Sequence, residues 1–362
     1  MSAGGWQPTP QHLQEICDML VISRNPLDPR YGDASAAVEH QMNNPEFVMH
    51  LAFILARLGP ESLGDDVRQL AGLVLKKSVA ANFRTFPPEI QAYVRGDMLV
   101  ALGDVNSQEV RRTAGIAITT IASRTELSQW PELMPHLLGM LDAQNQPTVE
   151  GCFMALRHIC EDSGEKLVDD AIGRPIDQLV PRLINFLECD VPSFKQSSIE
   201  CLNFVLMNVT AGRHDMPHVI LVHMDAYMGR LSALATDPNA AVRGAVCRAI
   251  VLLLEARYQC IEPNIAAVSE FMLLATCDAD ASVSIAACEF WPIFCECEAL
   301  APGSPMGQTI TDIMPRLIPA LMAGMVYNTE AIENFSVENA ENEAEADRIE
   351  DIRPIFHKNR AA

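Results

Sequence analysis

The sequence predicts an all-α fold in which about eight helix pairs stack side by side into a superhelical solenoid. Apolar residues make up 49 % of the chain but aromatic residues only 6 %, which is typical of helices that pack through Leu, Ala and Val. In residues 237–255, Val242, Val246, Ile250 and Leu253 recur at helical spacing. Further leucines widen this apolar surface, so the helix needs neighbours on more than one side. A stack of helix pairs provides them.

The same turn-then-helix pattern returns at a nearly constant interval. Six residues mark its phase, with spacings of 43, 39, 45, 48 and 41: Val67, Val110, Val149, Phe194, Val242 and Val283. A helix-turn-helix unit repeating at about 40–47 residues is typical of HEAT and armadillo repeats. An Asp precedes each marker and can accept backbone N–H bonds in the turn. Several of the markers are followed directly by an Arg, and we expect each such Arg to pair with an Asp of the next repeat.

Helix boundaries in the first half follow from turn residues and prolines. Residues 28–33 form a polar turn, residues 43–45 end a helix, and Pro87 and Pro88 stand where a missing N–H is tolerated. The expected helices cover residues 11–22, 34–42, 47–58, 67–83, 87–102 and 108–123.

The second half continues the pattern with one unusual helix. Helices are expected over 130–143 and up to residue 162, then repeats over 174–208, 219–258 and 261–298, and a helix over 309–326. Residues 209–218 are expected to form a polar loop. Pro292 lies inside the second helix of the seventh repeat, where it removes a backbone hydrogen bond and should kink the helix.

These patterns divide the chain into three segments. Residues 1–10 are expected to be a flexible leader, 11–326 the solenoid, and 327–362 an acidic segment inside the eighth repeat. A solenoid normally ends in a polar capping repeat, and none is visible. The sequence is therefore expected to be a fragment or a truncated gene model.

Charge and cysteine usage narrow the function classes. A net charge of −21 and a pI of 4.7 argue against binding nucleic acid or anionic membranes and favour partners with basic surfaces. No secretory signal or bilayer-spanning apolar stretch is visible. Eleven cysteines at irregular spacing indicate reduced thiols in a cytoplasmic or nuclear protein.

Candidate chemical motifs are weak. Cys288, Cys295 and Cys297 do not match a zinc-site spacing and are expected to be core thiols, while His214 and His218 flank a proline and are expected in a loop. No phosphate loop, dinucleotide fingerprint or nucleophile elbow occurs. The sequence therefore predicts a protein without cofactor, metal or catalysis.

Several longer sequence segments resemble those of a known family. They are AGLVLKKSV (71–79), TTIASRTELSQWPELMP (119–135), ICEDS (159–163), VCRAIVLLLEAR (246–257), ACEFW (287–291), IPALMAGM (318–325) and DIRPIFHKNR (351–360). The chain is similar to the N-terminal part of the importin-β superfamily of nuclear transport receptors, most closely to its transportin branch. The resemblance implies a shuttling import receptor whose B helices bind GTP-bound Ran on a concave face. It also implies phenylalanine-glycine nucleoporins as partners of the outer A helices, and signal-bearing cargo only for the full-length protein.

The resemblance also implies which residues meet Ran. Lys76, Arg111 and Asp162 fall on contact positions of the early repeats, and Glu289 and Glu296 on those of the seventh. The acidic segment would contribute Glu341, Glu343, Glu345, Asp347, Glu350 and Asp351.

Plainer interpretations stay open beside these. Arg111 could serve the Asp–Arg pairing between repeats instead of a partner, and Glu289 and Glu296 could be a solvated face. The alternative function is a HEAT scaffold of the phosphatase-regulatory kind, which would hold a basic protein without nucleotide-dependent binding to Ran.

Overall fold

The computed structural model describes residues 6–301 and 303–325. This part of the chain consists of α-helices, short 3-10 helices and their connections, with no strand among the described residues. Its contacts divide the chain into two compact units, Met1–Arg182 and Leu183–Ala362. None of the helices in the described part is long and apolar enough to cross a membrane.

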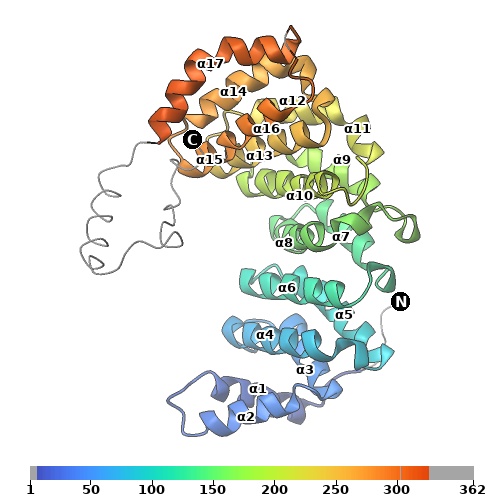
Figure 1. Cartoon of the computed structure of the whole chain (residues 1–362). Coiled ribbons are helices and arrows are strands. Elements are labelled where there is room, and N and C mark those ends of the chain that lie inside the picture. The colour runs from blue at the N-terminus through green and yellow to red at the C-terminus, as the bar shows by residue number, and fades with distance from the viewer. Residues whose placement is uncertain (1–5, 302, 326–362) are drawn as a thin grey trace, which may run out of the picture. The chain divides into compact units, whose positions relative to one another are not determined.

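The first unit is a stack of antiparallel helix pairs (Figure 1). Its helices are α1 (Pro10–Ser23), α2 (Tyr31–Gln41), α3 (Pro45–Arg57), α4 (Asp65–Asn82), α5 (Pro88–Leu102), α6 (Gln108–Arg124), α7 (Leu133–Leu141) and α8 (Gln146–Ser163). Short 3-10 helices cover Phe83–Thr85, Leu127–Gln129, Gly164–Val168 and Asp170–Ile172. The second helices of successive pairs, α4, α6 and α8, lie side by side. Helix α9 (Ile176–Phe186) spans the division between the units.

The second unit continues the same architecture. It contains α10 (Pro192–Thr210), α11 (His218–Val222), α12 (Met224–Leu234), α13 (Ala240–Arg257), α14 (Ile265–Thr276), α15 (Ala281–Cys288), α16 (Phe290–Glu296) and α17 (Pro305–Gly324). Two 3-10 turns, Tyr258–Cys260 and Glu262–Asn264, join α13 to α14. Here α13 packs between α10 and α15. The predicted α-solenoid of paired helices is therefore confirmed.

Helix starts follow the turn chemistry expected from the sequence. The side chains of Asn44, Ser107, Asn145, Asn239 and Asp280 each accept a backbone N–H from the first turn of the helix that follows. Such caps satisfy donors that would otherwise lack an intrahelical partner. Each cap also sets where the next helix starts, and with it the phase of the residues that face the core.

The predicted pairing between repeats is present at four junctions. In each, a cation near the start of one B helix bonds a carboxylate about one repeat further along, at or near the start of the next B helix. The pairs are Arg68–Asp104 (2.5 Å), Arg111–Glu150, Lys195–Asp237 (3.0 Å) and Arg243–Asp278 (2.9 Å). We call these four pairs the ladder. Two of them join an Arg to an Asp as expected, one uses Glu150 in place of Asp, and one uses Lys195 in place of Arg.

Several expected boundaries are wrong for identifiable reasons. Helix α17 begins at Pro305 because the Ser304 hydroxyl caps Gly307 N–H, four residues before the predicted start. The helix expected over 130–143 shortens to α7, because Trp130 leaves helical geometry (φ −132°, ψ 66°). The first helix of the sixth repeat is split at His223 into α11 and α12.

The end of the expected leader contacts the helices of the first unit. Within residues 1–10, Trp6 packs edge-on against His50 of α3 and Tyr93 of α5, at ring-centroid distances of 4.8 and 5.2 Å. Edge-to-face aromatic contacts of this kind stabilise a structure by about 0.5–1.5 kcal/mol. Trp6 therefore anchors the segment that precedes α1.

Candidate functional site

A hollow of about 650 Å³ opens on the B-helix face of the first unit. Three stacked helices line it with polar, basic and apolar side chains. The lining residues are Gln69, Lys76, Gln108, Glu109, Arg112, Ile116, Met154, Arg157 and His158. They come from α4, α6 and α8, and most of those on each helix lie three, four or seven residues apart. One continuous face of each helix therefore borders the hollow.

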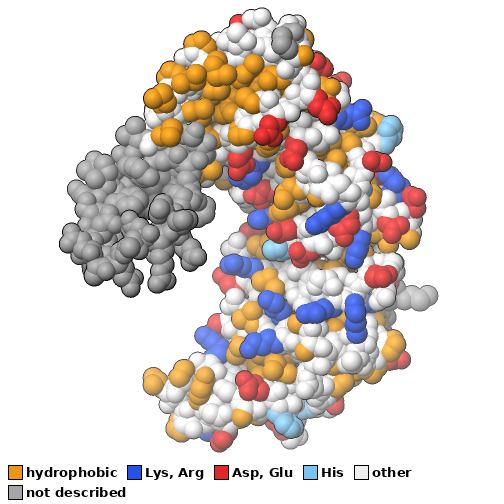
Figure 2. All heavy atoms as spheres, viewed as in Figure 1, with side chains coloured by type: hydrophobic (Ala, Val, Ile, Leu, Met, Phe, Trp, Pro, Cys, Tyr) orange, Lys and Arg blue, Asp and Glu red, His pale blue; other side chains and the backbone are white. Residues whose placement is uncertain are grey.

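The hollow is locally basic although the whole chain carries a net charge of −21. Lys76, Arg112 and Arg157 line it against one carboxylate, Glu109. Figure 2 shows Lys and Arg side chains gathered over the helices of this unit. Clustered cations attract acidic groups and set the orientation in which a partner docks.

Of the residues expected to contact a partner, Lys76 lines this hollow and is half-buried. Asp162 is exposed near the end of α8 and is not among the lining residues. The hollow therefore brings Lys76 together with Arg112 and Arg157, two residues that the sequence analysis did not select. The spacing of 36 between Lys76 and Arg112 is two helical turns short of the 43 residues that separate Val67 from Val110, so the two residues share a helix face, a signal that could have found the pair.

Arg111 has a different environment from its neighbour Arg112. Its side chain is buried, and its guanidinium donates to the Asp104 carbonyl at 2.8 Å and to the Glu150 carboxylate. These bonds make Arg111 a ladder residue, as the alternative interpretation had it. We therefore leave Arg111 out of the contact surface and place Arg112 there.

Glu289 and Glu296 are both exposed on the second unit. The expected kink near Pro292 is confirmed as an interruption, because α15 ends at Cys288 and α16 begins at Phe290. Partial burial raises the pKa of the Glu289 carboxyl, and the positive charge of Arg248 opposes this shift. The two-turn spacing of a continuous helix therefore does not apply to this pair.

The remaining sequence-based expectations have mixed outcomes. Of the three cysteines expected in the core, only Cys288 is buried. Cys295 lies on the exposed side of α16, and Cys297 is half-buried where the chain leaves that helix. His214 lies in the expected loop, with its Nδ1 2.8 Å from the Asp215 carbonyl oxygen. The acidic residues Glu341, Glu343, Glu345, Asp347, Glu350 and Asp351 lie outside the described residues.

Two further pockets belong to the second unit. The first, of about 500 Å³, lies between α12 and α14, which are first helices of neighbouring repeats, and is lined largely by apolar side chains, including Met228, Leu231, Val268 and Phe271. The sequence analysis did not foresee it, because its lining comes from separate repeats.

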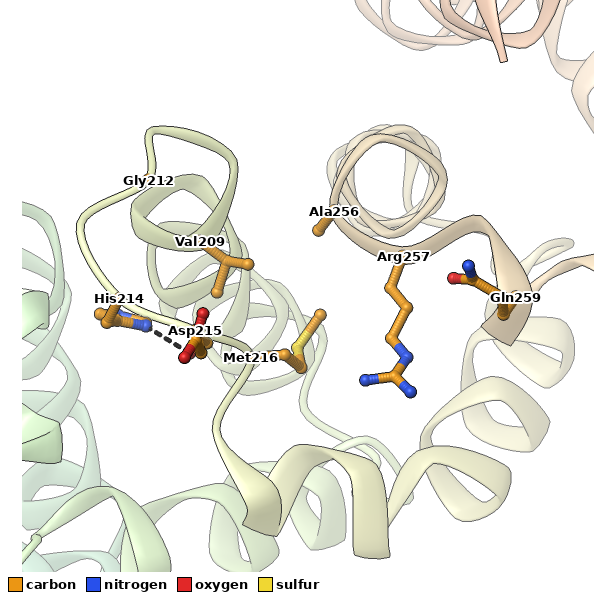
Figure 3. Close-up of a pocket in the computed structure, with 8 residues that line it drawn as sticks. All are labelled: Val209, Gly212, His214, Asp215, Met216, Ala256, Arg257 and Gln259. Atoms are coloured by element: carbon orange, nitrogen blue, oxygen red, sulfur yellow. Dashed lines mark hydrogen bonds between the residues drawn. The ribbon is translucent and has the colours of Figure 1, made fainter. Parts of the chain in front are cut away.

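The second of these pockets lies between the segment after α10 and the end of α13. In Figure 3, the side chains of Met216 and Arg257 extend into the gap between the two segments, while His214 turns to Asp215. The ionisable residues that line it are His214, Asp215 and Arg257, which do not form a nucleophile–base arrangement.

Comparison with known proteins agrees with the repeat architecture. Residues 36–104 match the importin-beta N-terminal domain. Transportin-1 of Mus musculus is 36 % identical over 355 residues, which are 98 % of this chain and 38 % of the relative. The chain thus spans about two fifths of the length of this relative.

Solved structures show the same fold. The Kap95:Nup1 complex matches with a TM-score of 0.66 and 15 % identity, covering 96 % of this chain and 40 % of the other. Kap95p, whose binding induces the switch loops of RanGDP to adopt the GTP-bound conformation, matches with a TM-score of 0.66 and 16 % identity at the same coverage. Fold and sequence agree, and the chain belongs to the importin-β superfamily, with transportins among its relatives.

Proposed function

We propose that this chain is the Ran-binding part of a nuclear import receptor and that it works by binding, without catalysis. The observation that carries the proposal is the basic hollow on α4, α6 and α8, where Lys76 and Arg112 stand together in an otherwise acidic chain. The effect of Kap95p on the Ran switch loops supports it, since that structure shares this fold. A receptor that contacts switch segments binds one nucleotide state more tightly than the other.

The second unit would contribute a face of opposite sign. Glu289 and Glu296 are exposed there and would meet basic groups of Ran, together with the acidic residues after 326. Like-signed clusters on a receptor increase association rates with an oppositely charged partner and make them sensitive to salt. Signal-bearing cargo would require the full-length receptor, which would shuttle between cytoplasm and nucleus.

The Ran assignment predicts nucleotide-dependent binding that reversal of charge in the hollow weakens. We expect this chain to bind Ran carrying a non-hydrolysable GTP analogue more tightly than Ran carrying GDP. Lys76→Glu with Arg112→Glu should weaken binding of the GTP form by at least about tenfold, because two attractive pairs become repulsive. Calorimetric titration measures both affinities.

A matched control lies one residue away. Lys77 is exposed and does not line the hollow, so Lys77→Glu should leave the affinity unchanged. Reversing Glu289 and Glu296 together should weaken binding and reduce its salt dependence. Unchanged affinity in the hollow variant would remove α4 and α6 from the interface. Equal affinity for both nucleotide states would favour the scaffold alternative instead.

A second binding function rests on the apolar pocket between α12 and α14. We propose that it receives phenylalanine side chains of phenylalanine-glycine nucleoporins. Its size of about 500 Å³ and apolar lining suit an aromatic ring, and the match to the Kap95:Nup1 complex supports a nucleoporin as partner. Its position on first helices leaves the B-helix faces free for Ran.

Filling this pocket should weaken nucleoporin binding. Ala267 lines the pocket and is exposed, so Ala267→Phe should occupy part of its volume and reduce the affinity for a phenylalanine-glycine peptide about tenfold. Ala266 is also exposed on α14 but does not line the pocket, so Ala266→Phe serves as the control. Fluorescence anisotropy of a labelled peptide reports both. Equal affinities for the two variants would contradict this assignment.

A further inference from the structure

Three metal-ligating side chains meet near the start of the chain. His12 comes from α1, while Glu46 and His50 come from the first two turns of α3. One ligand atom from each of the three lies within 4.8 Å of the others. The imidazole rings of His12 and His50 are 4.6 Å apart between centroids and nearly perpendicular, at 64°.

The hydrogen bonding of His50 leaves one ring nitrogen available to a ligand. Its side chain is buried, and Nδ1 lies 2.8 Å from the Glu46 carbonyl oxygen. A carbonyl accepts only from an N–H, so Nδ1 carries the proton and Nε2 carries a lone pair. Nε2 is buried and has no hydrogen-bond partner among the described residues.

The bond from His50 Nδ1 to the Glu46 carbonyl oxygen also fixes the orientation of the ring. An imidazole whose other nitrogen donates to a backbone carbonyl is the usual arrangement of a metal-binding histidine.

We propose that His12, Glu46 and His50 bind a zinc ion, with the fourth position of the tetrahedron taken by water. Two imidazoles and one carboxylate are a ligand set that zinc uses in proteins. Ca²⁺ and Mg²⁺ prefer oxygen ligands alone, so a site with two ring nitrogens selects against them.

The geometry requires a small inward movement. Ligand atoms at about 2.0–2.2 Å from a tetrahedral zinc lie roughly 3.4 Å from one another. The 4.8 Å limit therefore leaves at most about 1.4 Å to close. The exposed Glu46 and half-buried His12 can supply this by side-chain rotation, while His50 stays in place.

The surroundings of His50 hold its ring in place. Trp6 packs against it edge-on, and Trp6 in turn contacts Tyr93 of α5. A buried polar atom left without a partner destabilises a fold by about 1–3 kcal/mol. Zinc would satisfy Nε2 and link α1 to α3. It would thereby stabilise the first repeat, which lies at the end of the stack.

Zinc titration of the untagged, reduced chain tests the proposal. We expect binding of one zinc ion that depends on His12, and a rise in the midpoint of thermal unfolding when zinc is present. His12→Ala and Glu46→Gln should each weaken this binding at least about tenfold. Cobalt in place of zinc should give the visible absorption of a tetrahedral site in the wild-type chain but not in His12→Ala.

The control is a histidine of the first repeat that lies outside the cluster. His40→Ala on α2 should bind zinc as the wild-type chain does. The eleven cysteines are alternative zinc ligands, and the His12→Ala variant keeps all of them. Wild-type zinc affinity in both His12→Ala and Glu46→Gln would overturn the proposal and assign the zinc to thiols. Because Glu46 is exposed, its variant also reports on the site if His12→Ala loses its fold.

Discussion

Replacing Arg68 with alanine is expected to lower the free energy of unfolding by about 3–5 kcal/mol. The guanidinium is buried and donates to Asp104 at 2.5 Å, to Asp65 at 2.9 Å and to the Leu55 carbonyl at 3.0 Å. The substitution removes all three donors at once and leaves the Asp104 charge, which is 12 % exposed, without its cation. Chemical denaturation followed by circular dichroism measures the change.

An exposed pair provides the control for this experiment. Arg30 bonds Asp28 at 3.0 Å, but its side chain is 68 % exposed, so Arg30→Ala should change stability far less than Arg68→Ala does. A loss of similar size in both variants would mean that the ladder contributes no more than surface ion pairs do.

The ion pair between Arg68 and Asp104 also makes stability sensitive to acid. Burial alone would raise the pKa of Asp104, but hydrogen bonds from Arg68 and from the backbone of Asn106 and Ser107 outweigh it, so the pKa is lowered. A carboxyl with a lowered pKa in the folded state stabilises the fold above its ordinary value of 3.8. This contribution disappears as the pH falls through the lowered pKa, and Arg68→Ala should reduce the acid dependence.

Substituting alanine at Gly151 is the second change with a large expected effect. A Cβ at this position of α8 would lie 2.1 Å from the Leu102 carbonyl oxygen and 3.2 Å from Arg111 Cδ. The first contact is with backbone, so α5 and α8 must move apart. We expect a loss of about 1–3 kcal/mol, because overpacking of this kind outweighs the helix preference of alanine.

Gly139 gives the opposite expectation with the same chemical change. It lies on the exposed side of α7, and a Cβ there meets nothing within 4 Å. Gly139→Ala should therefore stabilise the chain by up to about 1 kcal/mol through helix propensity. The midpoints of thermal unfolding of Gly151→Ala and Gly139→Ala check both expectations. Effects of the same sign would contradict the close approach at Gly151.

The parts of the fold that depend on local chemistry could be predicted from the sequence. Caps such as Asn239 and Asp280 act within three residues, so their turns and the helices after them followed directly. The ladder could also be predicted, because it depends on the phase of the repeats. Arg111 directly follows the marker Val110, as Arg68 and Arg243 follow their own markers, and this equivalent position indicates that Arg111 belongs to the ladder.

The parts that depend on stacking could not be predicted from one segment. Glu46 and His50 share a helix face four residues apart, but His12 reaches them from another helix. The basic hollow likewise needs α4, α6 and α8 in their packed arrangement before Lys76 meets Arg112. The interruption at Glu289 was foreseen through Pro292, while the split at His223 had no proline to indicate it.

The ladder has a consequence for how such a chain changes length over time. Two repeats carry both halves of it, a carboxylate that meets the repeat before and a cation that meets the repeat after: Asp104 with Arg111, and Asp237 with Arg243. Duplication of either repeat therefore joins a cation to a carboxylate again and leaves no buried charge without a partner. A cut within a repeat breaks this complementarity, so gain and loss are tolerated in steps of one repeat.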